Sequence, residues 1–164
     1  MAWVAQQKDK LVAAEKKRVN REIKERKEKI KTRSDWIKVA QKAFNDYIRE
    51  RDKDDGCISC GAPLSKYDLL GAIGGSFDCG HYRSVGSARH LRFDERNAHG
   101  QCKKCNRYGA GRVTDYRIGL IKKIGLLAVE ALESDNKEKK YTIEDLKEIK
   151  KTYQLKLKEL RGKK

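Results

Sequence analysis

The sequence predicts an α+β protein that is mostly helical, with a small cysteine-held core between N-terminal and C-terminal helices. Two Cys-x-x-Cys pairs bracket this core. Apolar residues on both sides of it recur at helical three- and four-residue steps, whereas the bracketed segment contains a short strand-like run. Hydrophobic residues make up 38% of the chain and charged residues 39%, so the core must be small, and a bound metal would help it to stand alone.

These patterns divide the chain into four segments. We expect a basic helical arm over 1–33, an amphipathic helix packing on the core over 34–56, the core itself over 57–112, and C-terminal helices over 113–164. The arm is the most cationic segment, with 12 Lys and Arg against 5 Asp and Glu. A helix of this kind is either a solvated charged helix or one that needs a partner helix or a polyanion to be ordered.

The arm contains good helix formers over 5–31, without Gly or Pro. Four apolar residues follow at four- and seven-residue steps: Val12, Val19, Ile23 and Ile30. Lys16 and Arg26 occupy the intervening seam positions, so the heptad pattern is only half filled. Such a helix buries little apolar surface on its own.

A second helix is predicted over 35–51. Thr32, Ser34 and Asp35 form a start signal before an apolar run. The apolar positions recur at three- and four-residue steps: Trp36, Val39, Ala40, Ala43, Phe44, Tyr47 and Ile48. The aromatic residues of this face favour packing on the core over stacking on nucleic-acid bases. A turn at 54–56 ends the helix.

The rest of the chain predicts one strand and three further helices. Residues 61–76 are loop-like, and Phe77–Ser84 is typical of a short strand. A helix begins near Val113 and ends at Gly125, and a second short helix follows over 127–132. Thr142-x-x-Asp145 is a capping-box signal for a final helix.

The cysteine pattern predicts a structural zinc site. Its ligands are two pairs of thiols separated by 41 residues: Cys57, Cys60, Cys102 and Cys105. Four thiolates suit a closed tetrahedral site, which holds structure and leaves no position for catalysis. The alternative is free or redox-active thiols. Cys79 is left over, and we expect it to be a spare thiol beside the site.

The charge of the chain indicates a polyanionic partner. The net charge is +16 and the pI is about 9.7, which favours nucleic acid, with an anionic membrane surface as the alternative. No long apolar run predicts a transmembrane helix, and the first residues lack the apolar centre of a signal peptide. We therefore expect an intracellular protein, in which paired cysteines favour metal over disulfides.

Polar residues inside and just after the bracketed segment suggest chemistry. They are Asp78, His81, Asn97, His99 and Asn106. A carboxylate, an imidazole and amides at one place can bind a divalent ion and deprotonate water. Taken singly, each is more simply a hydrogen-bonded turn residue or a satisfied core histidine. Together with the cysteine frame and the charge, they favour a nuclease.

Three motifs carry a resemblance to a known family. They are Cys57–Cys60, Asp78-Cys-Gly-His81-Tyr, and Leu91-Arg-Phe-Asp-Glu-Arg-Asn97-Ala-His99-Gly-Gln-Cys102-x-x-Cys105-Asn106. This pattern resembles the phage lambda NinG (Rap) family of recombination endonucleases over about 34–161. It is also similar to the broader HNH, or His-Me finger, nucleases. The resemblance implies a ββα-metal core, a phage or prophage origin, and a place in the host cytoplasm or nucleoid.

The resemblance also implies catalytic roles. His81 would activate the attacking water, Asn97 would position the loop and the histidine, and Asn106 would bind a catalytic Mg²⁺ or Mn²⁺ ion. Asp78 is the nearby carboxylate for that ion, with His99 as a second ligand or a phosphate contact. Many relatives of this kind place Asp directly before the histidine, where this chain has Gly80. Because Asp78 and His81 are three residues apart, a regular strand would turn them to opposite faces, and a bulge near Gly80 would be needed to unite them.

The expected substrate is DNA, recognised by shape, since no base-reading motif is present. Basic residues surround the site and are the expected phosphate contacts: Arg83, Arg89, Arg92, Arg96, Lys103, Lys104, Arg107 and Arg112. His90 lies outside the motif and is expected at the surface or facing DNA. The resemblance implies cleavage of D-loops and Holliday junctions, and cutting both arms of a junction favours a homodimer. The alternatives are a non-catalytic zinc-stabilised DNA-binding accessory protein and, less favoured, a sequence-specific nicking enzyme.

Overall fold

A computed structural model describes residues 2–64 and 77–162 of the chain. The chain forms two compact units, residues 1–36 and 37–164, which are described separately. Most of the loop expected over 61–76 lies outside the described residues. Among the described helices, none combines the length and the apolar composition needed to cross a bilayer.

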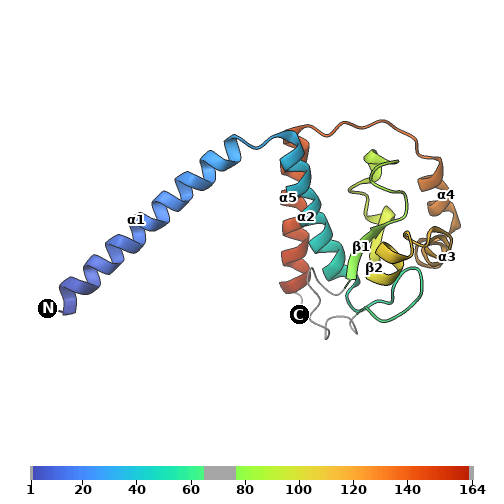
Figure 1. Cartoon of the computed structure of the whole chain (residues 1–164), viewed down its shortest axis with the longest axis horizontal. Helices are drawn as coiled ribbons and strands as arrows, with labels where there is room; N and C mark the ends of the chain where they lie inside the picture. Colours follow the sequence, from blue (N-terminus) through green and yellow to red (C-terminus); the bar gives the residue numbers. More distant parts are fainter. Residues whose placement is uncertain (1, 65–76, 163–164) are drawn as a thin grey trace. The chain divides into compact units, whose positions relative to one another are not determined.

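The first unit contains helix α1, Ala2–Lys29, which confirms the predicted N-terminal helix (Figure 1). Its last turn carries Arg26, Lys27 and Lys29, a favourable place for cations next to the helix C-terminus. Leu11 and Val12 are exposed, so the described apolar positions of α1 bury little surface, as the half-filled heptad predicts. The unit ends in the start of helix α2, Arg33–Asp52.

The predicted start signal of α2 is confirmed, with Thr32 as the capping residue. The Thr32 backbone N–H donates to Asp35 Oδ2 at 3.0 Å, and the Asp35 N–H donates to Thr32 Oγ1 at 3.2 Å. Each side chain thus satisfies a backbone donor that the helix start leaves unpaired. Thr142 and Asp145 form the same reciprocal pair at 2.8 and 3.1 Å before helix α5, Ile143–Gly162.

Aromatic side chains pack α2 against α5. Phe44 of α2 meets Tyr153 of α5 edge to face, with ring centroids 4.8 Å apart, and meets Phe93 in the same way at 5.8 Å. The Tyr153 hydroxyl donates to the Phe93 carbonyl at 2.9 Å. Trp36 and Tyr47 are both buried, so the aromatic face of α2 belongs to the core and not to a base-stacking surface.

The sheet consists of two antiparallel strands, β1 (Phe77–His81) and β2 (Ala98–Cys102). The expected strand ends at His81, three residues earlier than predicted. Pairing runs without interruption from Phe77 opposite Cys102 to His81 opposite Ala98. The paired stretch therefore contains no bulge, and strand alternation turns Asp78 and His81 to opposite faces. The bulge or bend near Gly80 that would be needed to unite them is not present in the paired stretch.

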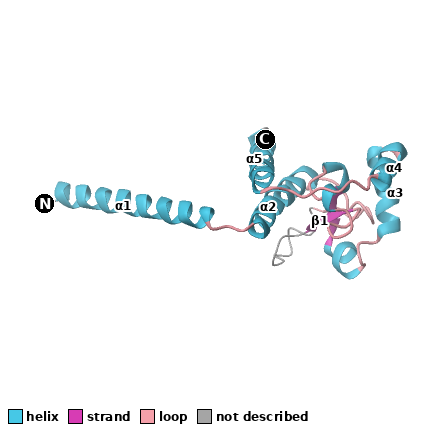
Figure 2. Cartoon of the chain, turned by 90° about the horizontal axis from the view of Figure 1, so that it is seen from above, coloured by secondary structure: helices cyan, strands magenta, loops and turns pink. Residues whose placement is uncertain are grey.

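Two further helices cover the other side of the strands. They are α3 (Val113–Ile124) and α4 (Leu126–Ser134), separated at Gly125 as predicted. Gly125 has φ +84°, a conformation that favours glycine, and its N–H donates to the Ile121 carbonyl at 2.9 Å. The strands lie between the α2/α5 pair and the α3/α4 pair (Figures 1 and 2). A strand, a loop, a strand and a helix therefore follow one another, in the order that the resemblance implies.

Asp52, the last residue of α2, joins that helix to the sheet. It is 1% exposed. Its Oδ2 accepts the Gly100 backbone N–H at 2.8 Å, and Arg51 donates to both carboxylate oxygens at 2.7 and 2.8 Å. Arg51 also donates to the Ala98 carbonyl at 2.8 Å. Burial raises the pKa of Asp52, but the hydrogen bonds from Arg51 and His99 outweigh it and hold that pKa well below its ordinary value.

Replacing Asp52 with asparagine should lower the free energy of unfolding by about 3 kcal/mol, because the substitution leaves the Arg51 guanidinium without its buried counter-charge. Urea unfolding at neutral pH measures this loss. Asp46→Asn is the matched control, since Asp46 pairs with Lys42 and Arg49 at the surface and should cost less than about 1 kcal/mol. Equal losses in the two variants would contradict the structural role of Asp52.

The same contact sets an acid limit on stability. The pKa of Asp52 is depressed in the folded protein. The ionised carboxylate therefore contributes fully to the free energy of unfolding above the unfolded-state pKa of about 4, and this contribution is lost as the pH falls from there through the folded-state pKa. Stability of the wild type should therefore fall more steeply below pH ~4 than stability of the Asp52→Asn variant.

Candidate metal centre

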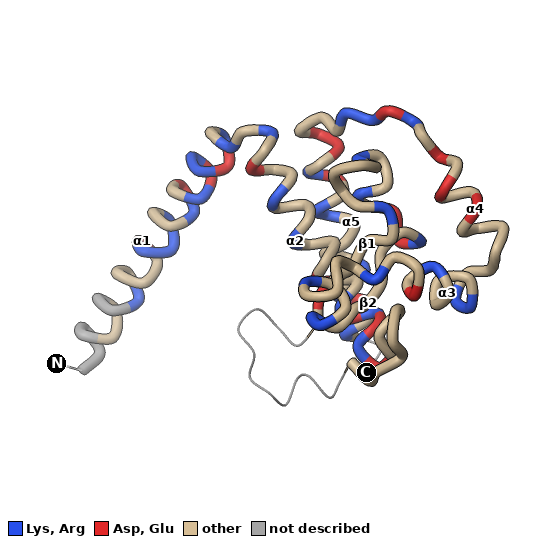
Figure 3. Tube along the Cα trace, turned by 45° about the vertical axis from the view of Figure 1, so that its right-hand side comes forward, with Lys and Arg blue, Asp and Glu red and all other residues tan. Residues whose placement is uncertain are grey.

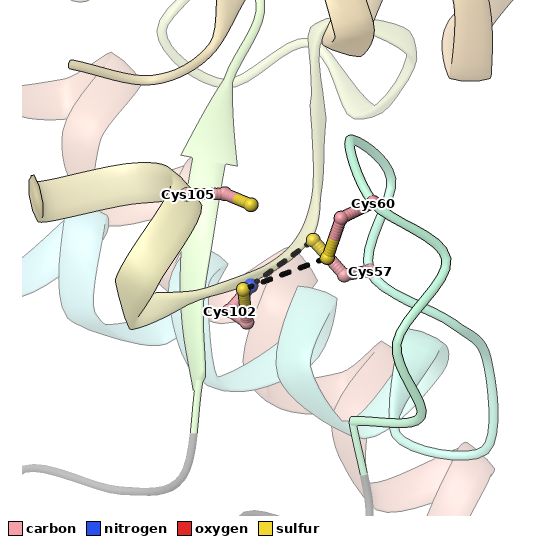
Figure 4. Close-up of side chains that lie close together, drawn as sticks. All are labelled: Cys57, Cys60, Cys102 and Cys105. Carbon is pink, nitrogen blue, oxygen red and sulfur yellow. Dashed lines mark hydrogen bonds between the residues drawn. The ribbon is translucent and has the colours of Figure 1, made fainter. Parts of the chain in front are cut away.

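Four cysteines meet at one end of the sheet (Figure 4). Cys57 and Cys60 lie on the turn after α2, Cys102 ends β2, and Cys105 lies in the short helical turn η4, Lys104–Tyr108. Their sulfur atoms all lie within 4.8 Å of one another. The two pairs, which have 41 residues between them in sequence, are thus brought together as the spacing predicts.

The spacing of the sulfurs suits a metal ion and not a disulfide. Cys60 Sγ and Cys102 Sγ are 3.9 Å apart. A tetrahedral site with Zn–S bonds of ~2.3 Å has sulfur atoms ~3.8 Å apart, whereas a disulfide requires ~2.05 Å. All four cysteines are free thiols. The cluster could therefore hold a metal ion such as zinc.

The backbone around the first cysteine pair is fixed to the strands. The Cys102 N–H points at Cys57 Sγ at 3.4 Å, and the Ile58 N–H donates to the Gly100 carbonyl at 3.1 Å. Helix α3 approaches the same turn closely: a Cβ on Gly119 would lie 1.9 Å from the Ile58 carbonyl oxygen. Only glycine permits this approach, so α3 and the cysteine turn form one packed body with β2.

Cys79 does not belong to the cluster. It lies in β1 opposite Gly100, and the group of close sulfurs omits it. Burial raises the pKa of its thiol to about 12, so it stays protonated at neutral pH. The expectation of a spare thiol is confirmed.

Asp78 and Asn106 are brought into contact next to this cluster. Asn106 Nδ2 donates to Asp78 Oδ2 at 2.9 Å although the residues are 28 apart in sequence. Arg107 donates to both Asp78 oxygens, at 2.7 and 2.8 Å. Burial raises the pKa of Asp78, but the hydrogen bonds from Arg107 and Asn106 prevail and keep it below its ordinary value. The carboxylate is therefore ionised at neutral pH.

His81 occupies the opposite face of β1. Its Nε2 lies 3.0 Å from the Arg92 carbonyl oxygen, and its ring centroid lies 5.9 Å from that of Phe44. Because a carbonyl can only accept, Nε2 carries the proton of the neutral ring, and Nδ1 is the nitrogen able to take one. Burial lowers the pKa of His81, and the Arg92 carbonyl offsets this only in part. The ring is neutral at pH 7, the state a general base requires.

Asn97 fixes the loop between the strands. It is fully buried, its Oδ1 accepts the Arg83 N–H at 2.8 Å, and its Nδ2 donates to the Arg83 and Leu91 carbonyls at 3.0 and 3.2 Å. These bonds hold both ends of the segment that leads to the Arg92 carbonyl, the partner of His81. The geometry is compatible with the positioning role that the resemblance implies, which remains a prediction.

Tyr116 was not predicted as part of this arrangement. This buried residue of α3 donates its hydroxyl to the Gly80 carbonyl at 2.9 Å and so fixes the peptide directly before His81. Its place four residues before Leu120, on the apolar face of the helix, was the available signal. An apolar stripe indicates burial but does not show which carbonyl a tyrosine reaches.

His99 is held inside the core. It is 3% exposed; its Nδ1 lies 3.0 Å from an Arg51 nitrogen and its Nε2 lies 3.1 Å from the Arg96 carbonyl. Both ring nitrogens are therefore engaged within the protein, and the expected role as a metal or phosphate ligand stays a prediction. His90 is also not a surface residue, since its Nε2 contacts the Asp135 carbonyl at 2.9 Å and its side chain is largely buried.

The predicted phosphate contacts differ in availability. Arg83 donates to the carbonyls of Leu132 and Glu133 at the end of α4, so its guanidinium is engaged within the protein. Arg92 donates to Gln41, and Arg96 pairs with Asp94. The remaining exposed members are Arg89, Lys104, Arg107 and Arg112. Lysines and arginines are distributed along α1 and also lie on segments around β2 and α3 (Figure 3).

Comparison with known proteins agrees with these motifs. The family model described as Bacteriophage Lambda NinG protein matches residues 1–163. The chain belongs to the NinG family. It is 49% identical over 139 residues to Protein ninG of Salmonella phage P22, which covers 85% of this chain and 64% of that protein. It is 47% identical over 140 residues to Protein ninG of Escherichia phage lambda, with the same coverage.

Protein ninG of Escherichia phage 933W is 46% identical over 140 residues, covering 85% of this NinG-family chain and 65% of that protein. The chain thus spans somewhat less than two thirds of the length of these relatives. No solved structure matches it.

Proposed function

We propose that this chain is a metal-dependent endonuclease that cleaves branched DNA, with a structural zinc ion held by the four cysteines. The contact between Asp78 and Asn106 carries the proposal. It brings a carboxylate of β1 and an amide of η4 to one place on a basic protein. Oxygen ligands of this kind suit Mg²⁺ or Mn²⁺, which bind through one or two protein groups and otherwise through water and phosphate.

The donor set fits a divalent ion with one condition. Asp78 Oδ1 and Oδ2 now accept hydrogen bonds from Arg107, so an ion would take the place of that guanidinium on the carboxylate. Arg107 would then be available for a phosphate, whose oxygens a planar guanidinium can bind through two parallel hydrogen bonds. A bound ion would stabilise the charge that develops on the phosphate and on the leaving oxygen.

His81 would supply the base. Its neutral ring can accept a proton at Nδ1 while the Arg92 carbonyl holds Nε2–H. Because Asp78 and His81 face opposite sides of β1, one phosphodiester can meet both only along the strand edge that β2 does not pair. In the described part of the chain, β1 has β2 as its single strand partner, which leaves that edge unpaired by any described strand.

Recognition would depend on DNA shape. The net charge of +16 supplies attraction to phosphates, and the sequence contains no motif known for reading bases. Branched molecules such as D-loops and Holliday junctions are the substrates that the family resemblance favours. Symmetric cutting of a junction favours a homodimer.

A cleavage assay tests the proposal. Zinc-loaded protein should cut a four-way junction or a D-loop with Mg²⁺ or Mn²⁺ and leave fully paired duplex intact, and EDTA should abolish cutting. The proposal fails if none of the branched substrates is cut with any divalent ion. Efficient cutting of plain duplex at one sequence would instead support a site-specific nicking enzyme.

A non-catalytic DNA-binding accessory protein is the second candidate. The full engagement of Asp78 by Arg107 and Asn106 favours it, because a carboxylate paired in this way needs no ion. Junction binding without cleavage, unchanged by Asp78→Asn and by added Mg²⁺, is the outcome that this candidate predicts.

A further inference from the structure

Tyr108 is the most exposed aromatic residue for which the structure gives a figure. It is 87% exposed, at the end of η4 and two residues after Asn106. Tyrosines elsewhere in the described unit 37–164 contact other rings or carbonyls, as Tyr116 and Tyr153 do. An exposed ring beside the candidate ion ligands therefore calls for a functional explanation.

The backbone that carries Tyr108 is held on both sides. Before it, Cys105 belongs to the four-sulfur cluster. After it, the Gly111 N–H donates to the Cys105 carbonyl at 3.0 Å, and Gln101 Nε2 donates to the Gly111 carbonyl at 2.7 Å. The Arg112 N–H closes the turn onto the Gly109 carbonyl at 2.9 Å. The ring thus projects from a fixed support.

The turn after Tyr108 also contains strained backbone. Three consecutive residues have positive φ: Ala110 at +49°, Gly111 at +80° and Arg112 at +44°. For a residue with a Cβ this conformation costs about 1–2 kcal/mol, and such strain persists only where the surrounding structure enforces it. The chain therefore turns sharply after Tyr108 and does not continue η4 directly into α3.

The surroundings of Tyr108 are cationic. Arg107 precedes it, and Lys104 and Arg112 lie on the same short segment; all three are exposed. Arg107 and Arg112 each pair with one carboxylate, Asp78 and Asp115. An exposed ring among cations that can bind phosphate is the combination found where proteins stack on unpaired bases.

We infer that Tyr108 stacks on an exposed base face of DNA and so selects DNA in which base stacking is interrupted. The inference rests on the DNA binding in the proposed function and names the element that recognises the branch. A tyrosine ring stacks on any base, which suits recognition without sequence preference. A continuous duplex covers the faces of its internal base pairs by stacking, whereas a bulge provides an unpaired base and an open branch point leaves base faces unstacked.

Binding of a bulged duplex tests the inference without any cleavage. The probe is a DNA duplex with one bulged 2-aminopurine, compared with the same duplex fully paired, both titrated with zinc-loaded protein in the absence of Mg²⁺. The wild type should prefer the bulged duplex and quench its fluorescence. Tyr108→Ala should lose about tenfold in affinity for the bulged duplex, together with the quenching, while affinity for the paired duplex stays the same.

Two variants make the test specific. Tyr108→Phe keeps the ring and should behave as the wild type, because stacking does not need the hydroxyl. Leu127→Ala removes a side chain of α4 that is 82% exposed and should leave the preference unchanged. Thermal unfolding should be equal for all variants, since neither side chain is buried.

The inference is overturned if Tyr108→Ala keeps the preference and the quenching, or if the wild type binds both duplexes equally. If the wild type binds neither duplex, DNA binding fails and the inference falls with it. If the preference depends on Tyr108 but branched DNA is never cut, the stacking role stands and the proposed nuclease activity is what fails.

Discussion

Cys102→Ser should abolish binding of about one zinc ion per chain and unfold the strand pair with the elements packed on it. Cys102 is buried, ends β2, and shares the sulfur cluster with the turn after α2. Binding of structural zinc contributes on the order of 10 kcal/mol in small domains, comparable with the whole stability of a domain this size. Zinc content by elemental analysis and unfolding by circular dichroism measure both effects.

Cys79→Ser is the matched control for the zinc prediction. It removes a thiol of the neighbouring strand that lies outside the sulfur cluster, so zinc content should stay at the wild-type value. Cys60→Ser should resemble Cys102→Ser even though Cys60 is exposed, because its effect comes from the metal and not from burial. Normal stability of Cys60→Ser without bound zinc would show that zinc does not hold the fold.

His81→Ala should lower the rate of junction cleavage at least 100-fold while changing junction binding less than about twofold. A general base typically contributes a factor of 10² to 10⁴ to the rate. Binding should change little because the half-buried ring is hydrogen-bonded to the Arg92 carbonyl and is not one of the predicted phosphate contacts. Single-turnover cleavage in Mg²⁺ and fluorescence anisotropy measure the two quantities. Asp78→Asn should reduce cleavage by a similar factor and should also weaken the response to Mg²⁺.

His90→Ala is the control for a histidine outside the proposed site. It is hydrogen-bonded to Asp135, so it should alter stability more than the cleavage rate of the folded fraction. The pH profile adds a second check. Because the pKa of His81 lies below its ordinary value of ~6.5, cleavage should persist at pH 6.5 and fall only as pH drops through the lower, folded-state pKa. Cleavage by His81→Ala at the wild-type rate would show that His81 is not the general base.

The helices and the cysteine cluster could be predicted because their signals are local. The reciprocal bonds of Thr32 with Asp35 and of Thr142 with Asp145 follow from residues three apart, and the Cys-x-x-Cys spacing alone suggests tetrahedral coordination. The alternation of a strand likewise predicted that Asp78 and His81 would face apart. Each of these depends on geometry within one element or one turn.

The interactions between elements could not be read in this way. In the sequence, Asp52 ends a charged helix and has the pattern of a solvated residue. In the structure its carboxylate is buried and accepts hydrogen bonds from Arg51 and from the Gly100 N–H. Arg83 matched the pattern of a phosphate contact, but carbonyls at the end of α4 lie within its reach. In both cases a partner distant in sequence decides the role of the charge, and composition gives no information about that partner.

The sulfur cluster also bears on how the two strands are aligned. Cys102 is both a member of the cluster and the partner of Phe77 in the ladder, so a metal ion bound there would fix the end of β2 relative to the turn after α2 and to η4. A slip of one residue would exchange the two faces of β1, carrying Asp78 to the side of Phe44 and His81 to the side of Asn106. The metal would therefore hold in place the strand on which β1 has to align, in a sheet of two five-residue strands. Cobalt substituted for zinc would give a visible spectroscopic signal of cysteine coordination during refolding, against which the formation of the sheet can be timed.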